Sequence, residues 1–116
     1  MKITSSAAVF TLALGVCCVL SSCASKMTDE KFADTAATLY ENVKANWDHP
    51  AGESWATYYE RRIAEACAKN NTEPAAWYGK MNDMIAHPEN YEKFLQKDVI
   101  ESLIEWEQQR QATKEG

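Results

Sequence analysis

Hydrophobic residues recur at spacings of three, four and seven through most of the chain after residue 28, which is typical of the buried face of an α-helix. The first such stretch covers about 29–47, and the second begins near Glu53 or Ser54 and breaks at 69–71. The apolar face of the first is formed by Phe32, Ala36, Leu39, Tyr40, Val43 and Trp47. That of the second is formed by Trp55, Tyr58, Tyr59, Ile63, Ala66 and Cys67.

Residues that favour helix ends separate these stretches. Thr28 is placed to cap the first helix, and the two acidic residues after it suit the positive end of the helix dipole. Pro50 and Gly52 end that helix, because the residue before a proline avoids helical angles. Thr72 and Pro74 predict a third helix, which ends near residues 86–87, with Thr72 as its cap and Pro74 in its first turn.

A fourth and longest helix is predicted to begin at Pro88. Its apolar stripe consists of Tyr91, Leu95, Val99, Leu103 and Trp106, supported by Phe94 and Ile104. Residues 108–111 are all polar, so this helix is predicted to fray there.

The pattern along the whole segment predicts an all-α domain. Apolar and polar residues nowhere alternate for more than a few positions, so strands are not expected. Four helices joined by short loops suggest a small up-and-down bundle over residues 29–112, with 113–116 as a frayed tail.

The first 22 residues have a different pattern. Residues 7–20 are almost wholly apolar, but this run of about 14 residues is shorter than the roughly 20 that a membrane-spanning helix needs. One basic residue, Lys2, precedes it, and small residues follow. A weakly basic start, a short apolar run and small residues are the parts of a secretory signal peptide.

The end of that run, Leu20-Ser21-Ser22-Cys23, resembles the lipobox of bacterial prolipoproteins. In that family an aliphatic residue and two small residues precede a cysteine, whose thiol is alkylated with diacylglycerol before a peptidase cuts on its N-terminal side. The resemblance implies that residues 1–22 are a cleaved signal peptide and that Cys23 carries the lipid. It covers residues 1–23 only.

The same resemblance implies where the protein works. Residues 23–28 would be the lipidated cysteine and a short tether, of which the five residues after Cys23 reach at most about 17 Å. The folded body would then lie close to the membrane of the bacterial cell envelope. Ala24 follows the modified cysteine, and by analogy with enterobacterial sorting it implies the outer membrane, facing the periplasm, if the organism has one.

The charge of the chain limits its partners. The chain has 12 basic and 17 acidic side chains, and removal of Lys2 with the signal peptide leaves a net charge of −6. An acidic body cannot neutralise phosphates, so nucleic acid is not expected as a partner. Attachment to the membrane is expected to come from acyl chains rather than from attraction to anionic lipid.

No residue pattern indicates a cofactor, a metal or an active site. His49 and His87 both precede proline, and neither has a further ligand at helical spacing. Glu101, Glu105 and Glu107 are expected to form a solvated helix face. Cys67 lies on an apolar face and is expected to be buried, although a reactive thiol or an intermolecular disulfide remains an alternative.

The aromatic residues are the candidates for a binding surface. Most of them fall on the helical stripes and are expected in the core. Tyr58-Tyr59 and Trp77-Tyr78 are adjacent pairs, and adjacent helical residues do not face the same way, so Tyr59 and Tyr78 are predicted to be exposed.

Three functions remain open for the body. The first is a non-enzymatic module that binds an unknown envelope protein or polymer. The alternative is a small-ligand binder with an aromatic- and Met-lined pocket between helices. The third is a minor enzyme or an inhibitor unit.

Overall fold

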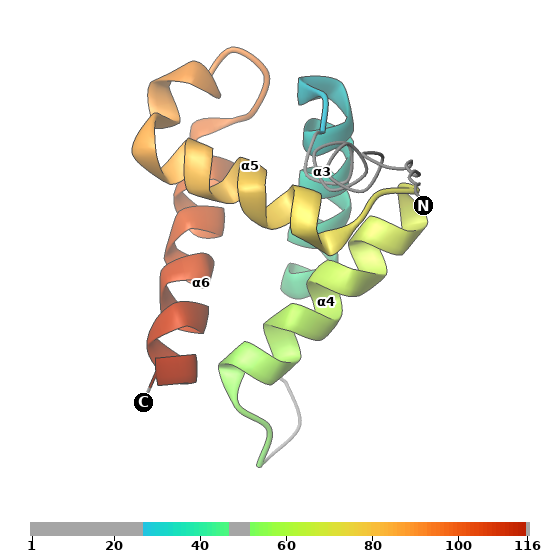
Figure 1. Cartoon of the computed structure of the whole chain (residues 1–116), viewed down its shortest axis with the longest axis vertical. Coiled ribbons are helices and arrows are strands. Elements are labelled where there is room, and N and C mark those ends of the chain that lie inside the picture. The colour runs from blue at the N-terminus through green and yellow to red at the C-terminus, as the bar shows by residue number, and fades with distance from the viewer. Residues whose placement is uncertain (1–26, 47–51, 116) are drawn as a thin grey trace, which may run out of the picture.

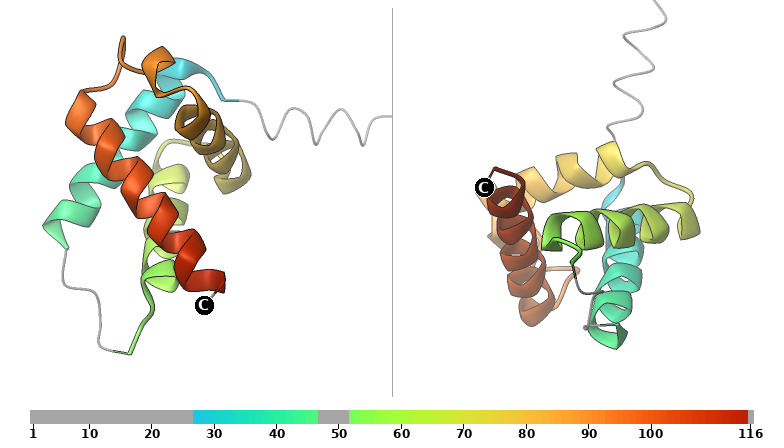
Figure 2. Two further views of the ribbon diagram at one scale, coloured as in Figure 1. Left: turned by 90° about the vertical axis from the view of Figure 1, so that its left-hand side faces the viewer. Right: turned by 90° about the horizontal axis from the view of Figure 1, so that it is seen from below.

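The computed structural model describes residues 27–46 and 52–115, and this part of the chain is all-α. It contains α3 (Asp29–Ala45), α4 (Trp55–Lys69), α5 (Pro74–Ala86), the short 3-10 helix η1 (Pro88–Asn90) and α6 (Lys97–Glu115). The helix α4 makes its most extensive contacts with α3 and α6 (Figure 1). The four α-helices form the expected bundle, but α5 crosses α6 at a steep angle in Figures 1 and 2 instead of lying antiparallel to it.

The predicted signal peptide, Cys23, the residues up to 26, Trp47 and His49 lie outside the described residues. Met27 is the first described residue, and it packs against the hydrophobic core.

Of the two predicted N-caps, Thr28 is confirmed, and Ser54 caps the second helix, for which a start near Glu53 or Ser54 was predicted. The Thr28 hydroxyl accepts a hydrogen bond from the Lys31 amide at 3.0 Å, and the Ser54 hydroxyl accepts one from the Thr57 amide at 3.2 Å. Thr72 is not a cap, because its amide donates to the Cys67 carbonyl at 2.9 Å and so belongs to the turn that closes α4. Pro74 begins α5 as predicted.

The prediction that the fourth helix begins at Pro88 is wrong. Residues 88–90 form η1, residues 91–94 form turns, 95–96 are irregular, and α6 begins at Lys97. The side chain of Tyr91 explains the break, because it inserts into the core, with its ring edge-on to Phe32 at 5.5 Å. Its hydroxyl also donates to Asp83 on α5 at 2.6 Å.

The predicted fraying of α6 is also wrong. The helix continues through residues 108–111 and to Glu115, so the helical domain extends beyond residue 112. Arg110 and Lys114 form ion pairs with Glu60 on α4, which tie the end of α6 to the bundle.

The hydrophobic core is built from α3, α4, α5, Tyr91 and α6. Trp77 of α5 packs on Phe32 of α3 with their ring centroids 4.8 Å apart. The core residues that are fully buried include Leu39, Ile63, Cys67, Trp77, Met81, Met84 and Leu103. Leu95 of the predicted stripe is only partly buried, while Ile100, which that stripe omitted, is in the core.

Candidate functional site

A groove on the surface separates α3 from the segment that leads into α6. It encloses about 380 Å³. One wall is formed by four residues of α3, which are Ala33, Ala37, Tyr40 and Glu41. The other wall is formed by Phe94, Leu95, Gln96 and Val99.

The side chains on both sides explain why the groove exists. On α3, Ala33 and Ala37 are too small to fill the space beside the helix. Opposite them, Phe94, Leu95 and Val99 pack against the core but stay partly exposed. Unlike scattered apolar surface residues, these line one continuous hollow, which is the arrangement that marks binding grooves.

The aromatic ring at one end of the groove is held in place. Tyr40 stacks on Trp106 of α6 with their centroids 5.8 Å apart and an interplanar angle of 26°. The ammonium of Lys44 lies 5.7 Å from the centre of the Tyr40 ring. The ring is thus a fixed part of the groove wall.

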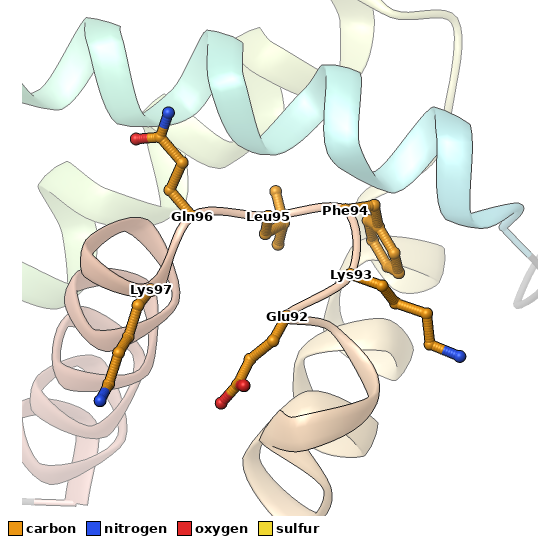
Figure 3. A pocket seen from close by; sticks show the side chains of 6 residues that line it. All are labelled: Glu92, Lys93, Phe94, Leu95, Gln96 and Lys97. Carbon is orange, nitrogen blue, oxygen red and sulfur yellow. The ribbon is translucent and has the colours of Figure 1, made fainter.

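The segment 92–97, which ends at the first residue of α6, has different side chains on its two sides, as Figure 3 shows. Gln96 points toward α3, whereas Glu92, Lys93 and Lys97 point away from it. A shallow hollow of about 490 Å³ lies along this segment, and its lining is mostly polar. The groove beside α3 combines apolar walls with a few polar groups, which is the usual composition of a binding site.

A second cluster brings four charged residues together where α4 and α6 meet. The guanidinium of Arg110 lies 2.6 Å from the carboxylate of Glu107 and 2.7 Å from that of Glu60. Lys114 reaches Glu60 at 3.0 Å, and the Gln111 amide donates to Glu107 at 3.0 Å. Glu107 is 1% exposed, so the prediction that it lies on a solvated face is wrong.

The position of Glu107 could have been found from the sequence. It stands four residues after Leu103 and seven after Ile100, which places it on the inner stripe of α6. The partner in α4 could not have been found, because Glu60 is 50 residues away from Arg110.

The ion pairs between α4 and α6 shift the pKa values of Glu60 and Arg110. Burial opposes ionisation of Glu60, but hydrogen bonds from Lys114 and Arg110 lower its pKa below the ordinary value of 4.5. The hydrogen bonds with Glu107 and Glu60 raise the pKa of Arg110, against the opposing effect of burial. Glu60 and Arg110 therefore stay charged near neutral pH, and the ion pairs of the cluster act as a clamp between α4 and α6.

Tyr59 is not exposed, contrary to the prediction. Its side chain is fully buried, stacked on Trp55 with centroids 5.3 Å apart. Its neighbour Tyr58 is also fully buried, because the guanidinium groups of Arg61 and Arg62 lie over its ring and its hydroxyl donates to the Asn46 carbonyl. Long side chains on the same helix thus cover a residue that would otherwise face water.

Tyr78 is partly exposed, but it belongs to the charged clamp. The Arg110 guanidinium lies 4.5 Å from the centre of its ring. Burial raises the pKa of Tyr78 to about 12. The two tyrosines predicted as an interaction surface therefore do not form one together.

Neither a metal site nor a membrane-spanning helix is found in the described ranges. No group of three or more His, Cys, Asp and Glu side chains in residues 27–46 and 52–115 could hold a metal ion. His87 lies at an exposed helix junction, 3.8 Å from Glu89. Of the helices described, none is both long and apolar enough to cross a membrane.

No protein-family profile, curated protein sequence or solved structure matches this chain.

Cys67 is buried as predicted, and this has a measurable consequence. Burial, with a further contribution from Glu73, raises the pKa of its thiol to about 11, so almost no thiolate is present at neutral pH. We expect native protein to react with iodoacetamide at Cys67 at least 100-fold more slowly than the urea-unfolded chain. Rapid labelling of native protein, or a dimer that reductant dissolves, would contradict the packing role.

Proposed function

We propose that this protein is a lipid-anchored bacterial envelope lipoprotein whose helical body binds a protein or envelope polymer without catalysis. The observation that carries the proposal is the groove between α3 and residues 94–99. It is apolar along its walls, it has polar groups at Tyr40, Glu41 and Gln96, and it is open at the surface.

The anchor would place this groove near the membrane. Because Met27 packs on the core and Thr28 caps α3, only residues 24–26 are left as a tether after Cys23. Cys23 to Met27 spans at most about 14 Å when fully extended. The groove begins about 6 Å and ends about 18 Å along α3, given the rise of an α-helix. A partner at or near the membrane surface would therefore be within reach.

The charged cluster where α4 and α6 meet favours a structural role for its residues over a catalytic one. Glu60, Glu107, Arg110 and Lys114 are engaged with one another across α4 and α6. Their function in the fold is to hold two helices together.

The small-ligand alternative has less support. It was expected to have an aromatic- and Met-lined pocket between helices, but Trp77, Met81 and Met84 are all fully buried in the core. The groove contains aromatic side chains, Tyr40 and Phe94, but its lining includes no methionine.

The proposal is tested by photo-crosslinking in the native host. A benzoylphenylalanine replaces Ala37, which is exposed and lines the groove, or Ala112, which is exposed on α6 and does not line it. We expect membrane-bound protein that begins at acylated Cys23 and forms a discrete adduct from position 37 but not from position 112.

Two results would contradict the proposal separately. Protein that keeps Met1, or soluble protein with unmodified Cys23, would rule out the anchor. Equal crosslinking from positions 37 and 112, or none from either, would rule out the groove as the binding surface.

A further inference from the structure

We infer that the groove takes a basic amphipathic segment of a partner polypeptide, bound with its apolar side chains against α3 and its cationic side chains at the rim. This inference rests on the proposed function and names the class of partner. It follows from the shape of the groove and from the charges around it.

The shape fits a helical or extended segment rather than a compact small molecule. Ala33, Ala37 and Tyr40 follow one another at spacings of four and three along α3, so the wall runs along the helix for about two turns. Phe94 and Val99 line the opposite side. An elongated apolar groove of this kind is filled by a segment that presents apolar anchors at regular spacing.

The charge of the groove selects a cationic partner. Of the residues that line it, Glu41 is the only charged one. Glu30 and Asp34 lie on the same side of α3 as Glu41, at spacings of four and seven residues, and all three are exposed.

Of the nearby lysines, Lys44 adds one positive charge at the Tyr40 end of the groove, against the three acidic residues of α3. The ammonium of Lys44 is placed over the Tyr40 ring at 5.7 Å from its centre. Lys93 and Lys97 point away from α3, on the far side of the segment 92–97 (Figure 3). The apolar walls thus have an acidic border along α3.

The same charges disfavour two other occupants. A second copy docked through this face would bring the acidic side of α3 against another acidic surface, on a chain with a net charge of −5. An anionic lipid surface would be repelled in the same way. A basic polypeptide gains from both the apolar walls and the acidic border.

The test uses two labelled peptides of 14 residues with leucines at identical helical positions. Lysine fills the remaining positions of one peptide, and glutamate fills those of the other. Binding to mature lipidated protein in phosphatidylcholine nanodiscs is measured by fluorescence anisotropy, with empty nanodiscs as the blank. We expect the lysine peptide to bind about tenfold more tightly than the glutamate peptide.

Two variants locate the site. Glu41→Lys is expected to weaken binding of the lysine peptide roughly fivefold, since an attraction near the surface becomes a repulsion. The matched control Glu65→Lys reverses an exposed charge on α4, outside the groove, and is expected to leave that affinity within about twofold. Circular dichroism of each variant confirms that the helices are retained.

The outcomes separate this inference from the proposed function. Equal affinity for both peptides, or an equal effect of Glu41→Lys and Glu65→Lys, would overturn the inference but leave groove crosslinking in cells intact. Concentration-dependent dimers that Ala37→Gln abolishes would assign the groove to a second copy. Stronger binding to anionic than to neutral vesicles, lost in Ala37→Gln, would assign it to lipid, and either result overturns the inference.

Discussion

Replacing Arg110 by methionine is expected to lower the free energy of unfolding by about 3–5 kcal/mol, because it leaves a buried carboxylate without its counter-charge. Glu107 is 1% exposed, and the guanidinium of Arg110 lies 2.6 Å from its carboxylate. Methionine keeps most of the length of the side chain, so lost packing contributes little. Urea unfolding followed by circular dichroism measures the effect.

A double variant separates the charge effect from packing. Arg110→Met combined with Glu107→Leu removes both charges, and it is expected to recover most of the lost stability, because hydrophobic replacement of a buried ion pair is often neutral. Arg61→Met is the surface control, since Arg61 pairs with Glu53 while 42% of its own side chain stays exposed. An Arg110→Met protein as stable as the Arg61→Met control would show that the clamp contributes nothing to the fold.

The clamp also predicts how stability depends on pH. Hydrogen bonds from Lys114 and Arg110 overcome burial and lower the pKa of Glu60 from 4.5 in the folded protein. A carboxylate with a lowered folded-state pKa contributes stability above its unfolded value, and that contribution disappears as the pH falls through the folded-state value. Lowering the pH should therefore reduce the free energy of unfolding of the wild type by more than it reduces that of the Arg110→Met variant.

Replacing Leu103 by alanine is expected to cost about 2–5 kcal/mol, because it removes buried methyl groups and leaves a cavity. Leu103 is fully buried in the core cluster. Leu95→Ala deletes the same atoms from a side chain that is only partly buried at the groove, so its cost should be clearly smaller. Unfolding midpoints in urea, measured for both variants, give the comparison.

The pair of leucine variants also tests the placement of the α6 boundary. Both residues belonged to one stripe in the predicted fourth helix, where they would be equally buried. Equal losses of stability in Leu95→Ala and Leu103→Ala would indicate that the helix begins at Pro88. The segment around Leu95 would then not form one wall of the groove.

Features that depend on a few neighbouring residues were predictable. The cap by Thr28, the start of α4 near Ser54 and the start of α5 at Pro74 depend on hydrogen bonds or backbone limits within about four residues. Burial of Cys67 followed from its place on the helical stripe of α4. These features are local, so the sequence alone determines them.

The break before α6 was not predictable in this way. Residues 88–107 have helical periodicity, yet Tyr91 packs against Phe32 and bonds Asp83, and the α-helix begins only at Lys97. The break involves Phe32, which lies 59 positions before Tyr91 in the chain, and a periodic pattern contains no information about such a distant contact.

The candidate site was decided by the tertiary structure. Its two walls, around Ala37 and Leu95, come from segments nearly 60 residues apart, and the hollow exists because small side chains on α3 meet a loop where a helix was expected. Tyr59, by contrast, was predicted to be exposed and is covered by α6 and by neighbouring aromatic rings. The sequence by itself determined that this segment forms amphipathic helices and where most of them begin, because helix period and capping act over a few residues. Which side chains remain at the surface depended on how those helices pack, because burial is set by contacts between segments that are distant in the chain.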